Sequence, residues 1–428
     1  MEERDNKQEY SFIKEKIKNK PINKRRLCLK ILWVISCGIL FGLMASLTFV
    51  VAKPKFEKLT SPGPGTVTLP PDEVDEPGNQ DEPDHTDPDN PSGQEPVYVK
   101  KELEVEDYQA LQNKLYAIGK KGNRSVVTVA GVINNTDWFE SAYESRIEAS
   151  GIIIANNGQE LLILTEKRVI ANVAAINITF VNNDTVTGTL KKYDGNTGIA
   201  IISVKLSDIS QETMGKIDVA KLGNSLTVNQ GTVVIAIGSP LGYNYSIRPG
   251  TVTSAGNTVS TWDCNYTIFT TDITGSASGS GVLINLSGDV VGLVMQGYSS
   301  QGDQNTITAL SISQLKGIIE DLSNGKAIPY LGMKVSTVTD EIAKDFGLPR
   351  GLYVKSVETA VESPAMSAGI QEADIITEIN GDEVLTVEQY TQKVHSLSPE
   401  QTVQIKVLRQ SGEKYVPLEC TAVVSVLP

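Results

Sequence analysis

The chain has 428 residues, with 38 Lys and Arg against 51 Asp and Glu, a formal net charge of -13, and two histidines, His85 and His395. Ten acidic residues and no basic ones fall between Asp72 and Glu95, so most of the negative excess belongs to one segment. The length allows two or three domains. With no basic stripe beyond the N-terminus, no CxxC pair and no Cys/His cluster, the sequence predicts neither nucleic-acid binding nor a metal site or other cofactor.

A basic tail, residues 1–30, precedes an uncharged apolar run, ILWVISCGILFGLMASLTFVVA, at residues 31–52. A helix needs about 20 apolar residues to cross the hydrocarbon core of a membrane. A cleaved signal peptide fits less well, because the run is long and the basic region before it is extended. We therefore predict one transmembrane helix over 31–52, in a single-pass protein of the cell membrane. The basic residues place the N-terminus in the cytoplasm and the main domains outside it.

Residues 53–103 follow, rich in proline, glycine and acidic residues and poor in large apolar ones. Such a segment cannot bury enough surface to offset its ordering entropy. We expect a disordered, extended linker, and His85 within it is expected to be solvated.

The next segment, residues 104–325, begins with helical apolar spacing over 104–119, carried by Val105, Tyr108, Leu111, Leu115 and Ile118. From Ser125 onward, short β-branched runs alternate with Gly, Asn and Asp, which is typical of an all-β barrel or sandwich. A second helical stretch, SISQLKGIIEDLSNG, closes this region. Residues 328–425 then alternate strands with two short helical pieces, which indicates a separate, smaller domain.

Four stretches between residues 105 and 425 are distinctive: VAKLGNSLTVNQGTVVIAIGSPLG, RPGTVTS, TTDITGSASGSGVLINLSGDVVGL and SPAMSAGIQEADIITEINGDEV. Together they resemble the HtrA/DegP family of serine proteases, and the resemblance covers roughly residues 105–425. It implies a mostly β fold: a chymotrypsin-like double β-barrel over 104–325, followed by an α+β PDZ domain over 328–425. It also implies that the protein can form trimers.

The resemblance breaks at the catalytic triad. In LTEKRVI the family's histidine position is Arg168, and in TGIAI its aspartate position is Gly198. A guanidinium carries five donors and no acceptor, so it cannot take a proton from a serine. Asp194 lies four residues before Gly198 and is not expected to reach the same point. Lys167 is an alternative base, but adjacent residues of a strand point to opposite faces.

The nucleophile position is ambiguous by one residue. Counting forward from Asp272 gives Ser280, whereas counting back from LINLSGDVVGL gives Gly279. Ser280 is therefore the one surviving candidate nucleophile, and an ordinary loop serine is the alternative interpretation. The loop also lacks the Gly-Asn-Ser-Gly-Gly string whose N–H groups would bind the developing oxyanion.

In the second domain, Tyr330, Leu331, Gly332 and Met333 resemble the carboxylate-binding loop of PDZ domains. Gly332 would permit close approach of a ligand, and Leu331 and Met333 would line the pocket for its last side chain. We predict these four residues as peptide-binding. His395 has helical spacing and is expected to be a packing or surface residue.

The resulting hypothesis is a membrane-anchored, extracytoplasmic pseudoprotease. It would bind peptide termini or misfolded segments through its PDZ domain, as a sensor or scaffold in protein quality control, and associate as a homotrimer or with HtrA-like relatives. Two alternatives stay open: an active HtrA-like serine endopeptidase with a non-standard catalytic set, and a structural oligomeric scaffold. A Cys264–Cys420 disulfide is also open at this point.

Overall fold

The computed structural model describes residues 65–72, 104–136, 142–300 and 305–427. Within these ranges, no helix is both long enough and apolar enough to cross a membrane. The basic tail 1–30, the predicted transmembrane helix over 31–52, and His85 lie outside the described residues. Cys264 and Cys420 are free thiols, and both are buried.

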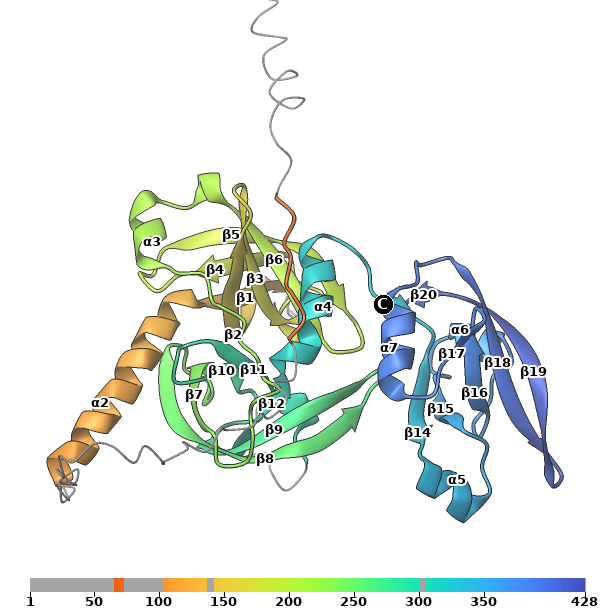
Figure 1. The fold of residues 1–428 in the computed structure, drawn as a ribbon. Helices are drawn as coiled ribbons and strands as arrows, with labels where there is room; N and C mark the ends of the chain where they lie inside the picture. The colour runs from red at the N-terminus through yellow and green to blue at the C-terminus, as the bar shows by residue number, and fades with distance from the viewer. Residues whose placement is uncertain (1–64, 73–103, 137–141, 301–304, 428) are drawn as a thin grey trace, which may run out of the picture. The chain divides into compact units, whose positions relative to one another are not determined.

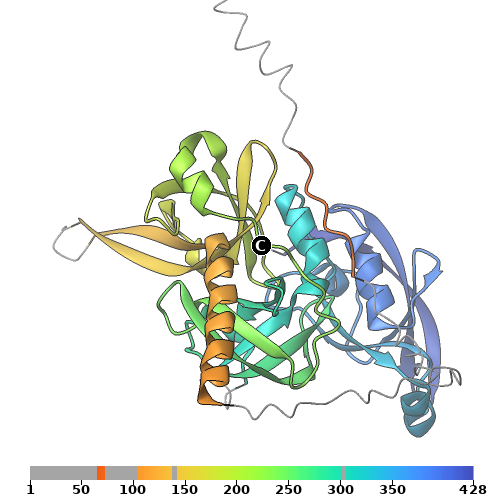
Figure 2. The same ribbon diagram turned by 60° about the vertical axis from the view of Figure 1, so that its left-hand side comes forward.

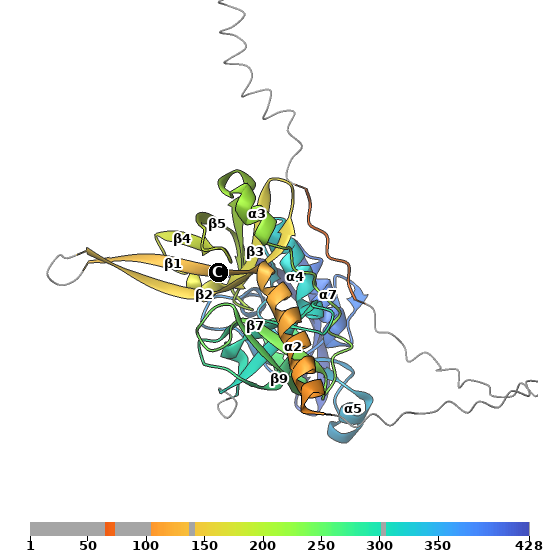
Figure 3. The same cartoon turned by 90° about the vertical axis from the view of Figure 1, so that its left-hand side faces the viewer.

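The first barrel is closed by antiparallel strands in the order β1-β2-β3-β6-β5-β4 (Figure 1). These strands are β1 (Val126–Thr136), β2 (Ala142–Asn156), β3 (Glu160–Glu166), β4 (Ala175–Thr179), β5 (Thr185–Asp194) and β6 (Ile199–Lys205). Aliphatic and β-branched residues fill β3 and β6, where Ile163 and Ile202 are fully buried, as suits strands at the centre of a barrel core. Figures 2 and 3 show the paired β1 and β2 projecting beyond the barrel as a long hairpin.

The second barrel repeats this design in the order β10-β11-β12-β9-β8-β7. Its strands are β7 (Val233–Ser239), β8 (Ser246–Ser260), β9 (Asn265–Thr274), β10 (Ser280–Ile284), β11 (Val290–Met295) and β12 (Thr306–Ser311). All residues of β10 and β11 are buried, which explains why their sequences are continuous apolar runs rather than alternating ones. The predicted double barrel is confirmed.

Two longer helices accompany the barrels, and both were predicted. Helix α2 (Val105–Gly122) packs on the second barrel (Figure 2). Gly119 lies directly against Ile247 there. Helix α4 (Ile312–Ser323) follows β12 and contributes to the largest apolar core, which is shared by both barrels. The shorter elements are α3 (Gln211–Lys216) and the single turns η1 (Asn123–Ser125), η2 (Lys167–Val169), η3 (Leu206–Asp208) and η4 (Gln296–Tyr298).

The C-terminal domain is the predicted α+β unit. Its main sheet has the order β14-β15-β16-β18-β19, with β17 paired to β16, and a small second sheet joins β13 to β20. The strands are β13 (Pro329–Tyr330), β14 (Met333–Val338), β15 (Gly351–Val357), β16 (Ile375–Ile379), β17 (Asp382–Glu383), β18 (Thr402–Ser411), β19 (Lys414–Val423) and β20 (Ser425–Val426). The helices are α5 (Asp340–Phe346), α6 (Pro364–Ser367) and α7 (Val387–His395). A capping box between Thr386 and Gln389 fixes the start of α7.

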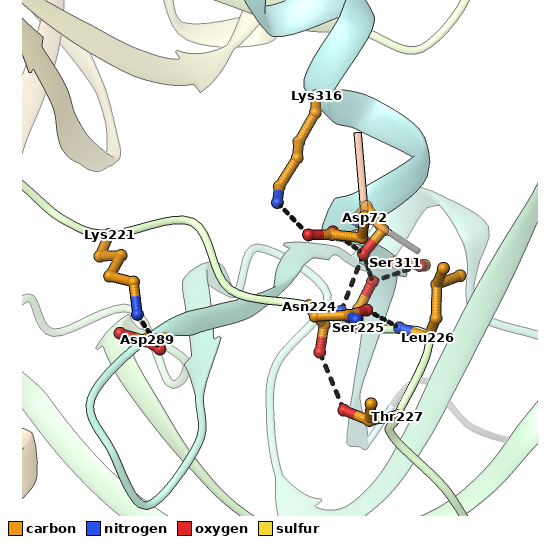
Figure 4. A network of polar contacts seen from close by, with 10 residues as sticks. Asp72, Lys221, Asn224, Ser225, Leu226, Thr227, Asp289, Ser311 and Lys316 are labelled. Atoms are coloured by element: carbon orange, nitrogen blue, oxygen red, sulfur yellow. Dashed lines mark hydrogen bonds and ion pairs between the residues drawn. The ribbon is translucent and has the colours of Figure 1, made fainter. Parts of the chain in front are cut away.

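Residues 65–72 correct one expectation, because they belong to the predicted disordered linker but pack along α4. The main chain of Val67 exchanges hydrogen bonds of 3.0 and 2.8 Å with the side chain of Asn324. The carboxylate of Asp72 forms a buried ion pair of 2.6 Å with Lys316 (Figure 4). It also accepts a hydrogen bond from Ser313. A buried lysine needs such a partner, so this part of the acidic segment is fixed by the charge of α4.

Candidate functional site

Arg168 lies in η2, directly after β3, and faces the loop before β10. Its Nε and Nη2 atoms donate to the two carboxylate oxygens of Glu166, at 2.8 and 3.1 Å. Nη2 also donates to the carbonyl oxygen of Ser278, at 3.2 Å. Arg168, which the resemblance puts at the family's histidine position, is therefore beside the loop 275–279 and acts there as a hydrogen-bond donor.

Ser280 begins β10, and its side chain is 1% exposed. Its hydroxyl oxygen accepts a hydrogen bond of 2.9 Å from the N–H of Ser150 in β2. The hydroxyl of Ser150 in turn donates to Asn244 at 2.8 Å. The Ser280 side chain thus connects the two barrels and is covered from solvent.

Gly279 is the second position that the sequence offers for the nucleophile, and its surroundings differ from those of Ser280. Its N–H donates to the carbonyl of Ser276 at 2.8 Å, and the N–H of Ser276 donates to the carbonyl of Pro240 at 3.0 Å. A Cβ atom at position 279 would lie 2.7 Å from the Pro240 oxygen. The position thus has no room for a side chain unless the main chain moves, and its N–H is used inside the loop.

The turn before β6 carries Gly198, whose φ is +76°. Asp194 starts this turn, and its carboxylate accepts hydrogen bonds from the N–H groups of Asn196 and Thr197 and from the Thr197 hydroxyl. Both oxygens therefore stabilise the turn itself. Lys167 donates its N–H to the Gly198 carbonyl at 2.7 Å, and its Nζ lies 4.2 Å from the centre of the Tyr193 ring.

The predicted carboxylate-binding loop has its N–H groups directed at one point. The N–H groups of Leu331 and Gly332 donate to Oδ2 of Asp263, at 2.7 and 2.8 Å, and that of Met333 donates to Oδ1 at 3.1 Å. We call these three N–H groups the nest, because successive N–H groups of this kind form an anion-binding concavity. Gly332 is required there: its φ is +89°, and a Cβ would lie 2.6 Å from the Cβ of Ser363.

Asp263, which no sequence motif marked, belongs to the β8–β9 turn of the second barrel. It is 5% exposed, and the hydroxyl of Tyr390 also donates to its carboxylate. Burial raises the pKa of the Asp263 carboxyl, whereas the hydrogen bonds from Gly332, Tyr390 and the rest of the nest oppose that rise. A lone aspartate in a tight turn has an ordinary local explanation, so only the fold could associate it with residues 331–333.

Tyr330 and His395 line a small cavity of about 10 Å³ beside the nest, together with Asp263 and Asp194. Tyr330 is 4% exposed, and its hydroxyl makes no hydrogen bond to any described residue. Burial lowers the pKa of His395. Across the described ranges, no group of three or more His, Cys, Asp or Glu side chains could hold a metal ion.

Comparison with protein families gives two matches, to the trypsin-like peptidase domain at residues 149–293 and to the PDZ domain at residues 329–419. The chain therefore carries regions that match a trypsin-like peptidase domain and a PDZ domain, and it is similar to HtrA/DegP-like proteins. The "Probable periplasmic serine endoprotease DegP-like" of Hahella chejuensis is 30% identical over 283 residues, 64% of this chain and 57% of that protein. The "Serine protease Do-like HtrB" of Bacillus subtilis is 29% identical over 253 residues, 55% of this chain and 53% of that one. The HtrA-like chain thus spans little more than half the length of these relatives.

Solved structures agree on the fold. The HtrA-type protease AlgW with a decapeptide has a TM-score of 0.52 at 20% identity and covers 73% of this chain and 99% of its own. A variant of AlgW with a tripeptide has a TM-score of 0.53 at 21% identity and covers 73% and 97%. At this identity the likeness concerns the fold alone. The catalytic and peptide-binding roles of the HtrA-like chain's residues therefore depend on the geometry described above.

Proposed function

We propose that this HtrA-like protein is a pseudoprotease that captures peptide carboxyl termini outside the cytoplasm. The observation that carries the proposal is the guanidinium of Arg168, which donates to the Ser278 carbonyl where the fold would require a base. General base catalysis contributes roughly 10²–10⁴-fold to such reactions. A group with five donors and no acceptor contributes none of it.

The nucleophile is missing for separate reasons. The hydroxyl of Ser280 is buried and already accepts the N–H of Ser150. Gly279 carries no side chain, and its N–H, which an oxyanion would need, donates to Ser276. Gly198 has no group to orient a base, and Asp194 is engaged in its own turn. Because triad members act as a unit, loss of several of them leaves negligible catalysis.

Peptide capture is supported by the PDZ domain. Strand addition requires a strand with a free edge and N–H groups for the terminal carboxylate. β14 is the end strand of its sheet, and the nest of residues 331–333 converges on carboxylate oxygens. The ligand class we propose is a protein or peptide carboxyl terminus with an apolar last residue, received by Leu331 and Met333.

The location is proposed from the sequence and from relatives. The apolar run 31–52 has the length of a membrane span, and the Hahella relative is named as periplasmic. The protein would be held at the cell membrane by this run, with both folded domains on the extracytoplasmic side. There it would act as a sensor or scaffold in protein quality control, as a homotrimer or together with HtrA-like relatives. The mass of the full chain in detergent tests its assembly.

The catalytic part is tested by casein turnover, comparing the full chain in detergent with Ser280→Ala and Ser278→Ala variants. Ser278 is the matched control, because it is the serine whose carbonyl Arg168 contacts. We expect all three proteins to show the same background rate. Turnover by the parent that either substitution abolishes would instead establish an active endopeptidase.

A further inference from the structure

The nest of the PDZ domain is occupied by the protein's own second barrel. The carboxylate of Asp263 receives the N–H groups of Leu331, Gly332 and Met333 at 2.7 to 3.1 Å. These are the donors that a peptide's terminal carboxylate would use. We infer that Asp263 is an internal ligand that closes the PDZ domain, so that a peptide carboxyl terminus must displace the β8–β9 turn in order to bind.

The main chain of Asp263 also binds the PDZ domain as the main chain of a peptide would. Its N–H donates to the carbonyl of Met333 at 2.7 Å, at the first residue of the edge strand β14. On the other side its carbonyl accepts a hydrogen bond of 3.0 Å from the hydroxyl of Thr391 in α7. The turn residue is therefore bonded to both the strand and the helix of the domain, as an added strand would be.

Simultaneous binding is excluded by space. Leu331 and Met333 are fully buried, and the cavity beside Asp263 measures about 10 Å³. A cavity of that size holds at most one water molecule. A peptide end therefore cannot share the nest with Asp263, and the two ligands compete for the same donors.

We expect the closed form, in which Asp263 occupies the nest, to be in equilibrium with an open form. Asp263 has a left-handed φ of 59°, which costs a non-glycine residue energy. Burial of its carboxylate is also unfavourable until the hydrogen bonds compensate it. If the closed form holds about nine-tenths of the molecules, the apparent affinity for a peptide falls about tenfold.

Displacement of the β8–β9 turn would also change contacts with the first barrel. Trp262 exchanges two hydrogen bonds with the Asn196 side chain, at 3.0 and 2.6 Å. Asn196 belongs to the turn that ends at Gly198, whose carbonyl binds the N–H of Lys167. Opening of the PDZ domain should therefore release the Trp262 N–H, which donates to Asn196 of the first barrel, while the Trp262 ring lies under Lys334 of β14.

The inference rests on the proposed peptide capture and is tested with two independent measurements. The first is anisotropy of a labelled peptide pool with random sequence and a free carboxyl-terminal valine, leucine or phenylalanine, bound to the full chain in detergent. We expect Asp263→Ala to bind the pool about tenfold more tightly than the parent. The matched control is Asp272→Ala, on the same hairpin, where the carboxylate binds Thr251 instead. It should bind like the parent, and a pool with amidated ends should show no gain.

Equal binding by the parent and Asp263→Ala would overturn the internal ligand and leave peptide capture intact. No binding by any variant would instead refute the proposed function. The second measurement needs no peptide: amide exchange at residues 331–333 should be up to about tenfold faster in Asp263→Ala than in the parent. If the alanine variant fails to fold, the isosteric variant Asp263→Asn replaces it. This variant presents an NH₂ group to the nest, so amide exchange at residues 331–333 should again be faster than in the parent. Unchanged exchange at those amides would refute closure by Asp263.

Discussion

The loop 275–279 of the peptidase domain and the loop 330–333 of the PDZ domain make opposite use of their N–H groups. In the first, the Gly279 N–H turns to the Ser276 carbonyl within the loop. In the second, three N–H groups converge on a carboxylate. Catalysis depends on side chains that single substitutions remove, and we propose that this has happened at Arg168 and Gly198. Carboxylate binding depends on the main chain and survives as long as Gly332 keeps the turn.

The largest expected effect comes from breaking the nest with Gly332→Ala. The new Cβ would lie 2.6 Å from the Ser363 Cβ at a φ of +89°. Left-handed strain and overpacking together should lower the free energy of unfolding by about 3 kcal/mol. Urea unfolding measures this loss, with Gly347→Ala as control. Gly347 also has a positive φ, but its Cβ would meet no atom within 4 Å, so its cost should be about 1 kcal/mol. Equal losses would contradict the tight packing of the nest.

A smaller change, Tyr390→Phe, weakens only the binding of Asp263 to the PDZ domain. It removes the hydroxyl that donates to Asp263 and leaves the three N–H groups in place. A hydrogen bond to a charged group contributes about 1.5 kcal/mol, so with nine-tenths of the molecules closed, amide exchange at residues 331–333 should become roughly sixfold faster. Tyr353→Phe on β15 is the control and should leave these amides unchanged. Equal exchange in both variants would remove Tyr390 from the closure.

A pH effect should follow from His395, whose pKa is lowered from 6.5 by burial and partly restored by Asp194, Asp321 and Asp263. Protonation of His395 favours the unfolded or opened state of the protein. The stabilisation that neutral His395 gives the closed form is therefore present above about pH 6.5, and it is lost as pH falls through the lowered pKa. The raised pKa of Asp263 acts with the opposite sign. Amide exchange at residues 331–333 against pH, in the parent and in His395→Gln, isolates the histidine. A profile unaffected by the substitution would contradict this role.

The smallest expected effect comes from an attempt to restore the catalytic set with Arg168→His and Gly198→Asp together. A Cβ at Gly198 would have room, since it would lie 3.7 Å from the Met295 Cε, but the φ of +76° strains any side chain there. We expect casein turnover to remain at background, because Ser280 stays buried and Gly279 has no hydroxyl. A rise of roughly 10² or more that Ser280→Ala abolishes would show that the nucleophile was present all along.

The sequence was sufficient to predict the features that depend on local patterns, such as apolar periodicity and turn residues. Periodicity and turn residues predicted the helices α2 and α4 and the β-rich region, and the resemblance supplied the order of barrel and PDZ domain. The position of Gly332 followed from the YLGM motif. The choice between Gly279 and Ser280 stayed open, because counting from either end of a shortened loop gives a different register.

Other features depend on residues far apart in the chain. Asp72 pairs with Lys316, although the surrounding composition predicted a solvated linker. Asp263 binds a loop some 70 residues later, and a single turn aspartate carries no sign of such a partner. Long-range pairing of individual charged groups is set by the packed fold, so it could not be predicted from local pattern.

The central claim is most directly tested by labelling the full chain with a fluorophosphonate probe, which reacts with activated serines, and mapping the modified residue by mass spectrometry. We predict no modification at Ser280 or Ser278 under conditions that label an active HtrA-like relative. Stoichiometric modification of Ser280 would contradict it.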